Sequence, residues 1–148
     1  MIETIPLPAT DYPPDAPFWS AALRSQLSIQ QCAYCQRLRF PPRPMCPHCQ
    51  SVEHAWVTLS GRAKVWSFTM PQPPLLPIFE KMLPYVVVLA EIVEDPSIRI
   101  IGNLVSETYE SITNVDITNL KIGADLRVRF RSCAIDVALP CWILSEEL

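Results

Sequence analysis

The sequence predicts a mainly β protein with a short N-terminal helix, a small cysteine-bound ribbon and a five-stranded barrel. Three observations carry this prediction. Residues 16–26 have the apolar face of a short helix, and four of the six cysteines fall in two Cys-x-x-Cys pairs within residues 32–49. From residue 61 onward, apolar and polar residues alternate with the period of half-buried strands. The predicted division is an arm and helix at 1–26, a ribbon at 27–59 and a barrel at 60–148.

The first segment reads as an extended arm that leads into a helix. Five prolines fall within residues 1–17 and keep the chain extended. Asp15 is placed to cap a helix over 16–26, with Pro17 tolerated in its first turn. The apolar face of this helix consists of Phe18, Trp19, Ala22 and Leu23. This face either packs on the protein's own body or docks on a partner, because an isolated helix of this length is marginal.

The cysteine segment "CAYCQRLRFPPRPMCPHC" has the spacing of a four-thiolate metal site. Each Cys-x-x-Cys turn presents two sulfurs, and two such turns complete a tetrahedron. Four protein ligands leave no open position for water or substrate, so the site is expected to be structural. Zinc is the expected ion, and iron is the alternative that the same ligands accommodate. The predicted ligands are Cys32, Cys35, Cys46 and Cys49.

The remaining polar and sulfur side chains near or beyond this segment are not assigned to the metal site. The position after each second cysteine often carries glycine, since the backbone there can need a left-handed conformation, and here Gln36 and Gln50 occupy it. His48 is not expected to replace a cysteine as a ligand. Cys133 and Cys141 are interpreted as buried free thiols that act as small hydrophobes.

The segment from residue 60 to 148 is predicted to contain about five strands. They are "GRAKVWSFTM", "YVVVLAEIVE", "IRIIGNLV", "LKIGADLRVRFRS" and "CAIDVALPCWIL", with a turn at "EDPSI" between the second and third and another at Gly123 before the fourth. A helical turn is expected near 113–121. This count suits a small Greek-key barrel of the OB type, and a five-stranded sandwich fragment is the alternative.

A long proline-rich connection, "PQPPLLPIFEKMLP" at 71–84, separates the first two barrel strands. It folds over the end of the barrel, or it offers an apolar contact surface to a partner or an acyl chain. The residues assigned to that surface are Leu75, Leu76, Ile78 and Phe79.

Charge and terminal composition argue against several classes of protein. The formal net charge of −3 disfavours a general nucleic-acid binder, which needs clustered lysine and arginine. The first residues have neither a basic nor an apolar region of a secretory signal, and no apolar run reaches the roughly 18 residues that span a bilayer. The cytoplasm is therefore the expected location, where paired cysteines bind metal more often than they form disulfides.

Taken in order, these segments resemble one family. "PFW" opening a helix, then the cysteine segment, then "GRAKVWSFT", "PYVVVLAEI" and "LKIGADLRV", are similar to the OB-fold, acyl-CoA-associated proteins with an N-terminal rubredoxin-like zinc ribbon, known as domain of unknown function thirty-five. The resemblance covers about residues 18–142. Its motifs are specific in combination, since the zinc motif alone is common to many families.

The resemblance implies a non-catalytic small subunit of a hetero-oligomer. Family members accompany thiolases, hydroxymethylglutaryl-CoA synthase or retro-aldolases that shorten steroid side chains, and some accompany MaoC-like hydratases. The partner supplies the catalytic residues, and the small subunit helps to form or stabilise the acyl-CoA site. The residues agree with this expectation, because the sequence carries no recognisable nucleophile–base–acid set and no phosphate-binding glycine loop.

Three arginines of the ribbon are the candidate contacts for CoA or for the partner. Arg37, Arg39 and Arg43 lie between the two cysteine pairs, and guanidinium groups suit the phosphates of CoA or an acidic partner edge. A solvated polar face is the plainer interpretation. From a different functional class, a stand-alone nucleic-acid-binding protein remains the alternative, because OB barrels and zinc ribbons both serve there.

Overall fold

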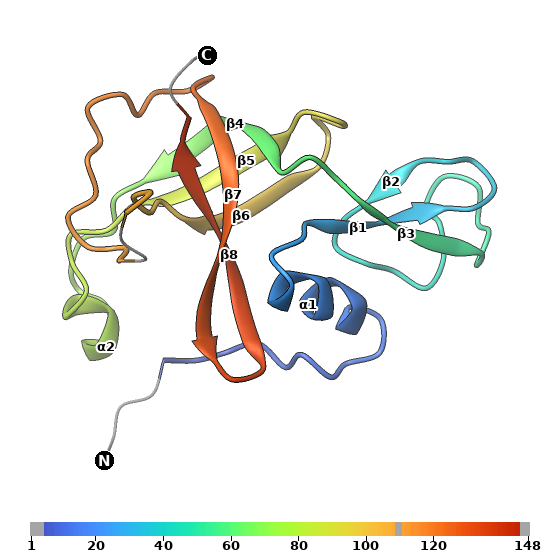
Figure 1. Cartoon of the computed structure of the whole chain (residues 1–148), viewed down its shortest axis with the longest axis horizontal. Coiled ribbons are helices and arrows are strands. Elements are labelled where there is room, and N and C mark those ends of the chain that lie inside the picture. Colours follow the sequence, from blue (N-terminus) through green and yellow to red (C-terminus); the bar gives the residue numbers. More distant parts are fainter. Residues whose placement is uncertain (1–4, 109–110, 146–148) are drawn as a thin grey trace.

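The computed structural model describes residues 5–108 and 111–145 of the chain. It contains two β bodies, a three-stranded sheet of order β2-β1-β3 and a five-stranded sheet of order β6-β5-β4-β7-β8. Helix α1 lies between them, and the N-terminal arm runs past the lower end of the β7–β8 hairpin toward that helix (Figure 1). The mainly β class and the order helix, ribbon, barrel are confirmed.

Helix α1 spans Ala16–Leu23 and is shorter than the predicted 16–26. Asp15 is the N-cap residue, but its side chain makes no capping hydrogen bond. The helix ends early because Ser25 takes a left-handed backbone with φ of 57°, and the N–H groups of Arg24 and Gln26 both close on the carbonyl oxygen of Ala21. This ending directs the chain straight into the ribbon.

The ribbon sheet contains β1 (Ser28–Cys32), β2 (Leu38–Arg39) and β3 (His54–Thr58), with β1 in the centre and antiparallel to both neighbours. Strands β1 and β2 thus flank the first cysteine pair. Strand β1 is buried along almost its whole length, whereas β3 is largely exposed. The central strand therefore ties the ribbon to the rest of the protein.

The barrel consists of β4 (Arg62–Thr69), β5 (Val87–Ile92), β6 (Arg99–Asn103), β7 (Asp125–Ala134) and β8 (Val137–Leu144). The sheet closes between its edge strands β6 and β8, where Leu104 forms a parallel bridge with Trp142. Closure of a five-stranded sheet with this order confirms the OB-type barrel over the sandwich alternative. In β7, Leu126 and Phe130 are buried and Arg127 is exposed, as the alternation predicts, whereas Val128, Arg129 and Arg131 are half-buried.

Helix α1 contributes to the barrel core. Phe18 and Ala22 are buried in one cluster with Phe130, Ala138 and the fully buried Trp142. The interpretation that the helix packs on the protein's own body holds for this face, and Leu23 points outward with 47% of its surface exposed.

Two connections differ from the sequence prediction. The segment 113–121 forms turns, such as the bond from the Leu120 N–H to the Ile117 carbonyl oxygen at 3.0 Å, and no helix. The 71–84 connection instead contains a one-turn helix, α2 (Pro77–Glu80). In the described part of the chain, no helix has the length and apolar character required to cross a bilayer.

Candidate metal centre and apolar groove

The four predicted ligands converge at one end of the ribbon. Their sulfur atoms all lie within 4.8 Å of one another, although they come from two turns of the chain that are ten residues apart. The Sγ atoms of Cys32 and Cys49 are 3.5 Å apart, and those of Cys35 and Cys46 are 3.6 Å apart. A metal–sulfur bond of about 2.3 Å places the corners of a tetrahedron about 3.8 Å apart, so the four sulfurs fit a tetrahedral ion such as zinc.

The two knuckles stabilise thiolates by backbone hydrogen bonds. The N–H of Cys35 lowers the pKa of the Cys32 thiol, and the N–H of Cys49 lowers the pKa of Cys46 to about 6. At Cys49 the N–H of Ser51 acts in the same direction, but burial and the three neighbouring sulfurs outweigh it and raise that pKa to about 11. Four sulfurs this close cannot all ionise without a cation among them, which is the environment that a structural metal requires.

Gln36 and Gln50 occupy the left-handed positions that the sequence indicated. Their φ angles are 62° and 64°, a region in which a side chain is strained and glycine is not. Each N–H closes its knuckle by donating to the carbonyl oxygen of the first cysteine, at 3.1 Å to Cys32 and 2.9 Å to Cys46. The metal site thus holds both residues in a backbone conformation that they do not favour.

The three candidate arginines do not gather on one surface. Arg37 is exposed, and its guanidinium pairs with Nδ1 of His48 at 2.7 Å. Arg39 is only 5% exposed, and it donates to Oε1 of Gln30 at 2.5 Å and to the carbonyl oxygen of Arg43 at 3.0 Å. Arg39 therefore has a structural role inside the ribbon that sequence reasoning did not anticipate.

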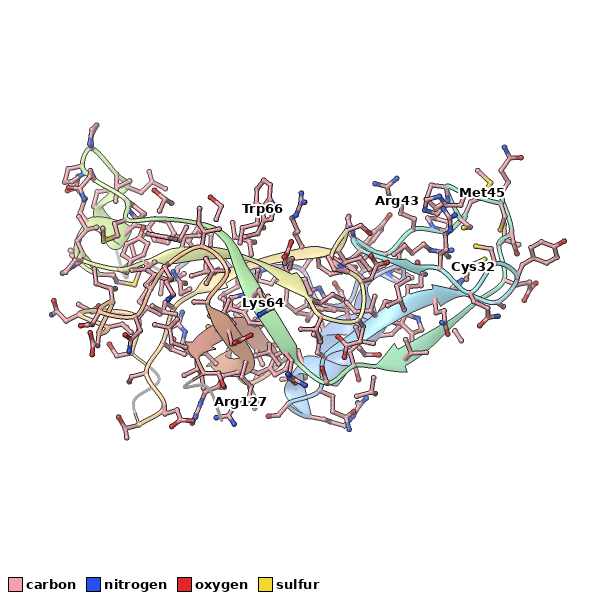
Figure 2. All side chains as sticks on the ribbon, turned by 90° about the horizontal axis from the view of Figure 1, so that it is seen from above. Cys32, Arg43, Met45, Lys64, Trp66 and Arg127 are labelled. Atoms are coloured by element: carbon pink, nitrogen blue, oxygen red, sulfur yellow. The ribbon has the colours of Figure 1, made fainter. Side chains whose placement is uncertain are left out.

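Arg43 completes this network through its backbone while its side chain remains exposed. Its N–H donates to the same Oε1 of Gln30 at 2.9 Å, so one buried amide oxygen fixes two points of the proline-rich hairpin. Figure 2 shows the Arg43 side chain projecting from the ribbon on the same side as Trp66 of β4. Gln30 is the residue that sequence reasoning missed, and a polar side chain in a buried strand was the available signal.

The residues predicted to bind a partner are also placed separately. Phe18 is buried in the core, and Trp19 packs against that core beside it. In the 71–84 connection, Phe79 contributes to a second apolar cluster around Tyr85, Val105 and Ile143, and therefore helps to cover the end of the barrel. Leu76 is 62% exposed, while Leu75 and Ile78 are half-buried.

An apolar groove of about 380 Å³ lies where the arm, α1, the ribbon hairpin and the barrel meet. Its lining includes five prolines, and Asp15 is the only charged residue among the described residues that line it. Sequence reasoning missed this groove, because its walls come from four segments that are distant in the chain. The lining prolines are Pro6, Pro8, Pro41, Pro42 and Pro140.

The ribbon and the barrel each match the model of a known protein family. The model of the ChsH2 rubredoxin-like zinc ribbon domain matches residues 19–54, and the model of the ChsH2 C-terminal OB-fold domain matches residues 56–131. The chain belongs to the ChsH2 family. The family resemblance drawn from the sequence is thereby confirmed, and the ribbon match supports zinc as the ion for the four cysteines of this ChsH2-family chain.

Curated relatives of this ChsH2-family chain include larger proteins. A "probable enoyl-CoA hydratase alpha subunit" of Thermomonospora curvata is 43% identical over 99 residues, which are 66% of this chain and 30% of the relative. The 3-oxo-4,17-pregnadiene-20-carboxyl-CoA hydratase alpha subunit of Mycobacterium tuberculosis is 34% identical over 86% of this chain and 35% of its own length. A DUF35 domain-containing scaffold protein of Methanocaldococcus jannaschii is 34% identical over 55% of this chain and 57% of its own. The chain thus spans about a third of the two hydratase subunits.

Solved structures match over nearly the whole chain. A chain of the Ltp2-ChsH2(DUF35) aldolase superposes with a TM-score of 0.76 and 31% identity, covering 93% of this chain and 98% of that one. A DUF35-family protein from Sulfolobus solfataricus shares the fold at a TM-score of 0.58 and 16% identity. The ribbon and the barrel together are therefore the unit that this chain shares with the aldolase assembly.

Proposed function

We propose that this chain is a non-catalytic accessory subunit that binds a thiolase-like or aldolase subunit and helps to form or stabilise its acyl-CoA site. The observation that supports this most strongly is the end-to-end match to a chain of the Ltp2-ChsH2(DUF35) aldolase, at 93% and 98% coverage. The hydratase relatives support a CoA thioester as the substrate of the assembly, with steroid side-chain degradation as the first candidate pathway. A MaoC-like hydratase is the second candidate partner.

The chemistry of the side chains agrees with a supporting role. The four thiolates form a closed tetrahedron, which leaves no position for a substrate. Burial raises the pKa of the free thiol Cys141, which is the opposite of what a nucleophile requires. The histidine rings are engaged locally, His48 with Arg37 and His54 with the carbonyl oxygen of Val52. In this proposal the partner supplies the catalytic groups, and reduced thiolates suit a cytoplasmic setting.

For the acyl-CoA site, the proposal assigns the phosphate contacts to the exposed guanidinium groups. Arg37 and Arg43 are exposed on the ribbon and are available to the nucleotide end of CoA or to an acidic edge of the partner. Arg39 stays in the proposal as the residue that positions the hairpin carrying them. The apolar contact surface includes Leu76 of the 71–84 connection and Trp19 beside the groove.

The nucleic-acid alternative is less well supported. Trp66 and Phe68 are the exposed aromatic residues of the first barrel strand, and the Arg99 guanidinium lies 3.9 Å above the ring centre of Trp66. One face of the indole is therefore covered and cannot stack on a base.

Co-expression with a candidate thiolase-like or aldolase subunit tests the proposal. We expect a stable complex on size exclusion, and thiolysis or retro-aldol cleavage of acyl-CoA only when both chains are present. The variants Arg37→Ala and Arg43→Ala should raise the KM for acyl-CoA of the complex, with Arg24→Ala, on the exposed end of α1, as the matched control. Absence of a complex together with tight single-strand DNA binding by the isolated chain would sink the proposal.

A further inference from the structure

The outer face of strands β4, β5 and β6 carries apolar side chains that the rest of the barrel leaves exposed. In β6 the buried Ile100 faces the core, so its neighbours Arg99 and Ile101 point outward, and 63% of the Ile101 surface is exposed. Leu89 of β5 is paired directly opposite Ile101 and is half-buried. Because residues paired in this way share one face of a sheet, Leu89 and Ile101 are neighbours on the outer face.

A β-bulge in β4 adds a tryptophan to this outer face. The register between β4 and β5 shifts between Val65 and Ser67, and the extra residue is Trp66. A bulge re-aims the side chain that it carries, and here 44% of the Trp66 surface is exposed. The indole reaches across β5 to β6, because its ring centre lies 3.9 Å from Cζ of Arg99. This contact orders the ring before any partner arrives, which lowers the entropy cost of binding.

The outer face continues into the apolar groove. Ile101 belongs to both, since it also lines the groove together with Trp19 of α1 and Phe40 of the ribbon hairpin. Exposed apolar patches with polar rims mark interaction sites, and this one combines residues of the helix, the ribbon and the barrel. We call it the docking face, and its members are Trp19, Phe40, Pro42, Trp66, Leu89 and Ile101.

Two exposed guanidinium groups flank the docking face. Arg99 belongs to β6, and Arg43 lies in the ribbon hairpin directly after the residues that line the groove. Figure 2 shows the side chains of Arg43 and Trp66 projecting from the same side of the molecule. The carboxylates of Asp15, in the groove lining, and of Glu91, paired opposite Arg99, belong to half-buried residues. Positive charge is thus exposed at this rim, whereas the whole chain has a formal net charge of −3.

We propose that the docking face binds the thiolase-like or aldolase subunit, through a patch on that subunit with an apolar centre and an acidic rim. This inference rests on the proposed function and names the surface that performs it. Tryptophan and arginine are among the residue types most enriched where protein interfaces gain most of their binding energy, and this face presents Trp66 and Arg99 in contact. A second copy of this chain suits the face less well, because it would bring another positive rim, and like charges across an interface are unfavourable.

The first test places a charge at the centre of the docking face. Ile101→Asp changes an exposed side chain, so the fold is kept, and it sets a carboxylate against the apolar centre and acidic rim of the partner. With the candidate thiolase-like or aldolase subunit as the probe, we expect the affinity in a titration to fall about 100-fold. Ile135→Asp is the matched control, because Ile135 is fully exposed between β7 and β8, outside the docking face, and it should bind like the wild type. Zinc content and circular dichroism report whether each variant is folded.

The second test reverses the charge at the rim. Arg99→Glu should slow association with the same subunit about tenfold and weaken its dependence on salt, because attraction to an acidic rim acts mainly on the association rate and is screened by ions. Arg99→Lys keeps the charge and should retain most of the rate. Arg24→Glu, at the exposed end of α1, is the control for the change in net charge. Faster association of Arg99→Glu would show that the facing rim is basic and would overturn the assignment.

The outcomes separate this inference from the function on which it rests. If the wild-type chain forms no complex with the subunit, both proposals are wrong. If a complex forms, but Ile101→Asp and Arg99→Glu bind as their controls do, the docking face is wrong and the accessory role stands. If the isolated wild-type chain sediments as a dimer and Ile101→Asp abolishes that dimer, the occupant is a second copy and the assignment to the partner is overturned.

Discussion

The buried amide of Gln30 offers a quantitative test of how the ribbon hairpin is held. Gln30 is 2% exposed, and its Oε1 accepts from Nε of Arg39 and from the N–H of Arg43. Gln30→Ala leaves a buried guanidinium N–H and a peptide N–H without an acceptor. A bond to a charged donor contributes about 1.5–3 kcal/mol and a neutral bond about 0.5–1.5 kcal/mol, so the free energy of unfolding should fall by about 2–4 kcal/mol.

The assay is urea unfolding of the zinc-saturated chain, followed by far-UV circular dichroism and by metal release to a chromogenic chelator. Gln30→Glu is the control, because a carboxylate still accepts both bonds and also pairs with the Arg39 charge. The double variant Gln30→Met with Arg39→Met should lose less than the sum of its single variants, since it buries no unpaired charge. The reasoning is refuted if Gln30→Ala stays within about 0.5 kcal/mol of the wild type, the range of ordinary surface changes.

Three further results are expected. Cys46→Ser should abolish stoichiometric zinc and unfold the ribbon, because the site loses a ligand, and full zinc retention measured by atomic absorption would contradict the four-ligand assignment. Gln50→Gly should raise the Tm by an amount equivalent to about 1 kcal/mol, because glycine adopts the left-handed φ of 64° without strain. An unchanged or lower Tm would show that the knuckle is not strained. Gly102→Ala should lower the free energy of unfolding by about 1–3 kcal/mol, because its Cβ would lie 2.5 Å from a carbonyl oxygen. Gly123→Ala is the control, since its Cβ meets no atom within 4 Å and only a φ of 85° is strained. If urea unfolding gives both variants the same loss of stability, the contact at Gly102 is not tight.

The metal site could be predicted in full because its geometry is local. Each Cys-x-x-Cys turn carries its two sulfurs in a fixed relation, and the Gln36 and Gln50 positions follow from the same turn. The strands of the barrel were predicted for a related reason, since burial on one face imposes alternation on the sequence itself. In β7, Leu126 and Phe130 face the core and Arg127 faces the solvent, as the alternation in the sequence indicates.

The errors fall where tertiary contacts decide the outcome. The segment 113–121 has no continuous apolar face and forms turns. In the 71–84 connection, Pro77 begins the single turn of α2, because proline is tolerated in the first turn of a helix. Arg39 was interpreted as a surface residue because arginine is mostly exposed. Its burial depends on the acceptor that Gln30 supplies from a neighbouring strand.

The sequence by itself determined the ribbon, its four ligands and the number of barrel strands, because spacing and period are properties of the chain. Only the tertiary structure decided which surfaces remain open. Pro140 within a strand pattern indicates an unpaired edge, but it does not say which strand lies opposite. That Gly102 lies against this proline, beside a groove built from the arm, α1, the ribbon and the barrel, follows from the closure of the barrel, which brings together residues about 40 apart in sequence.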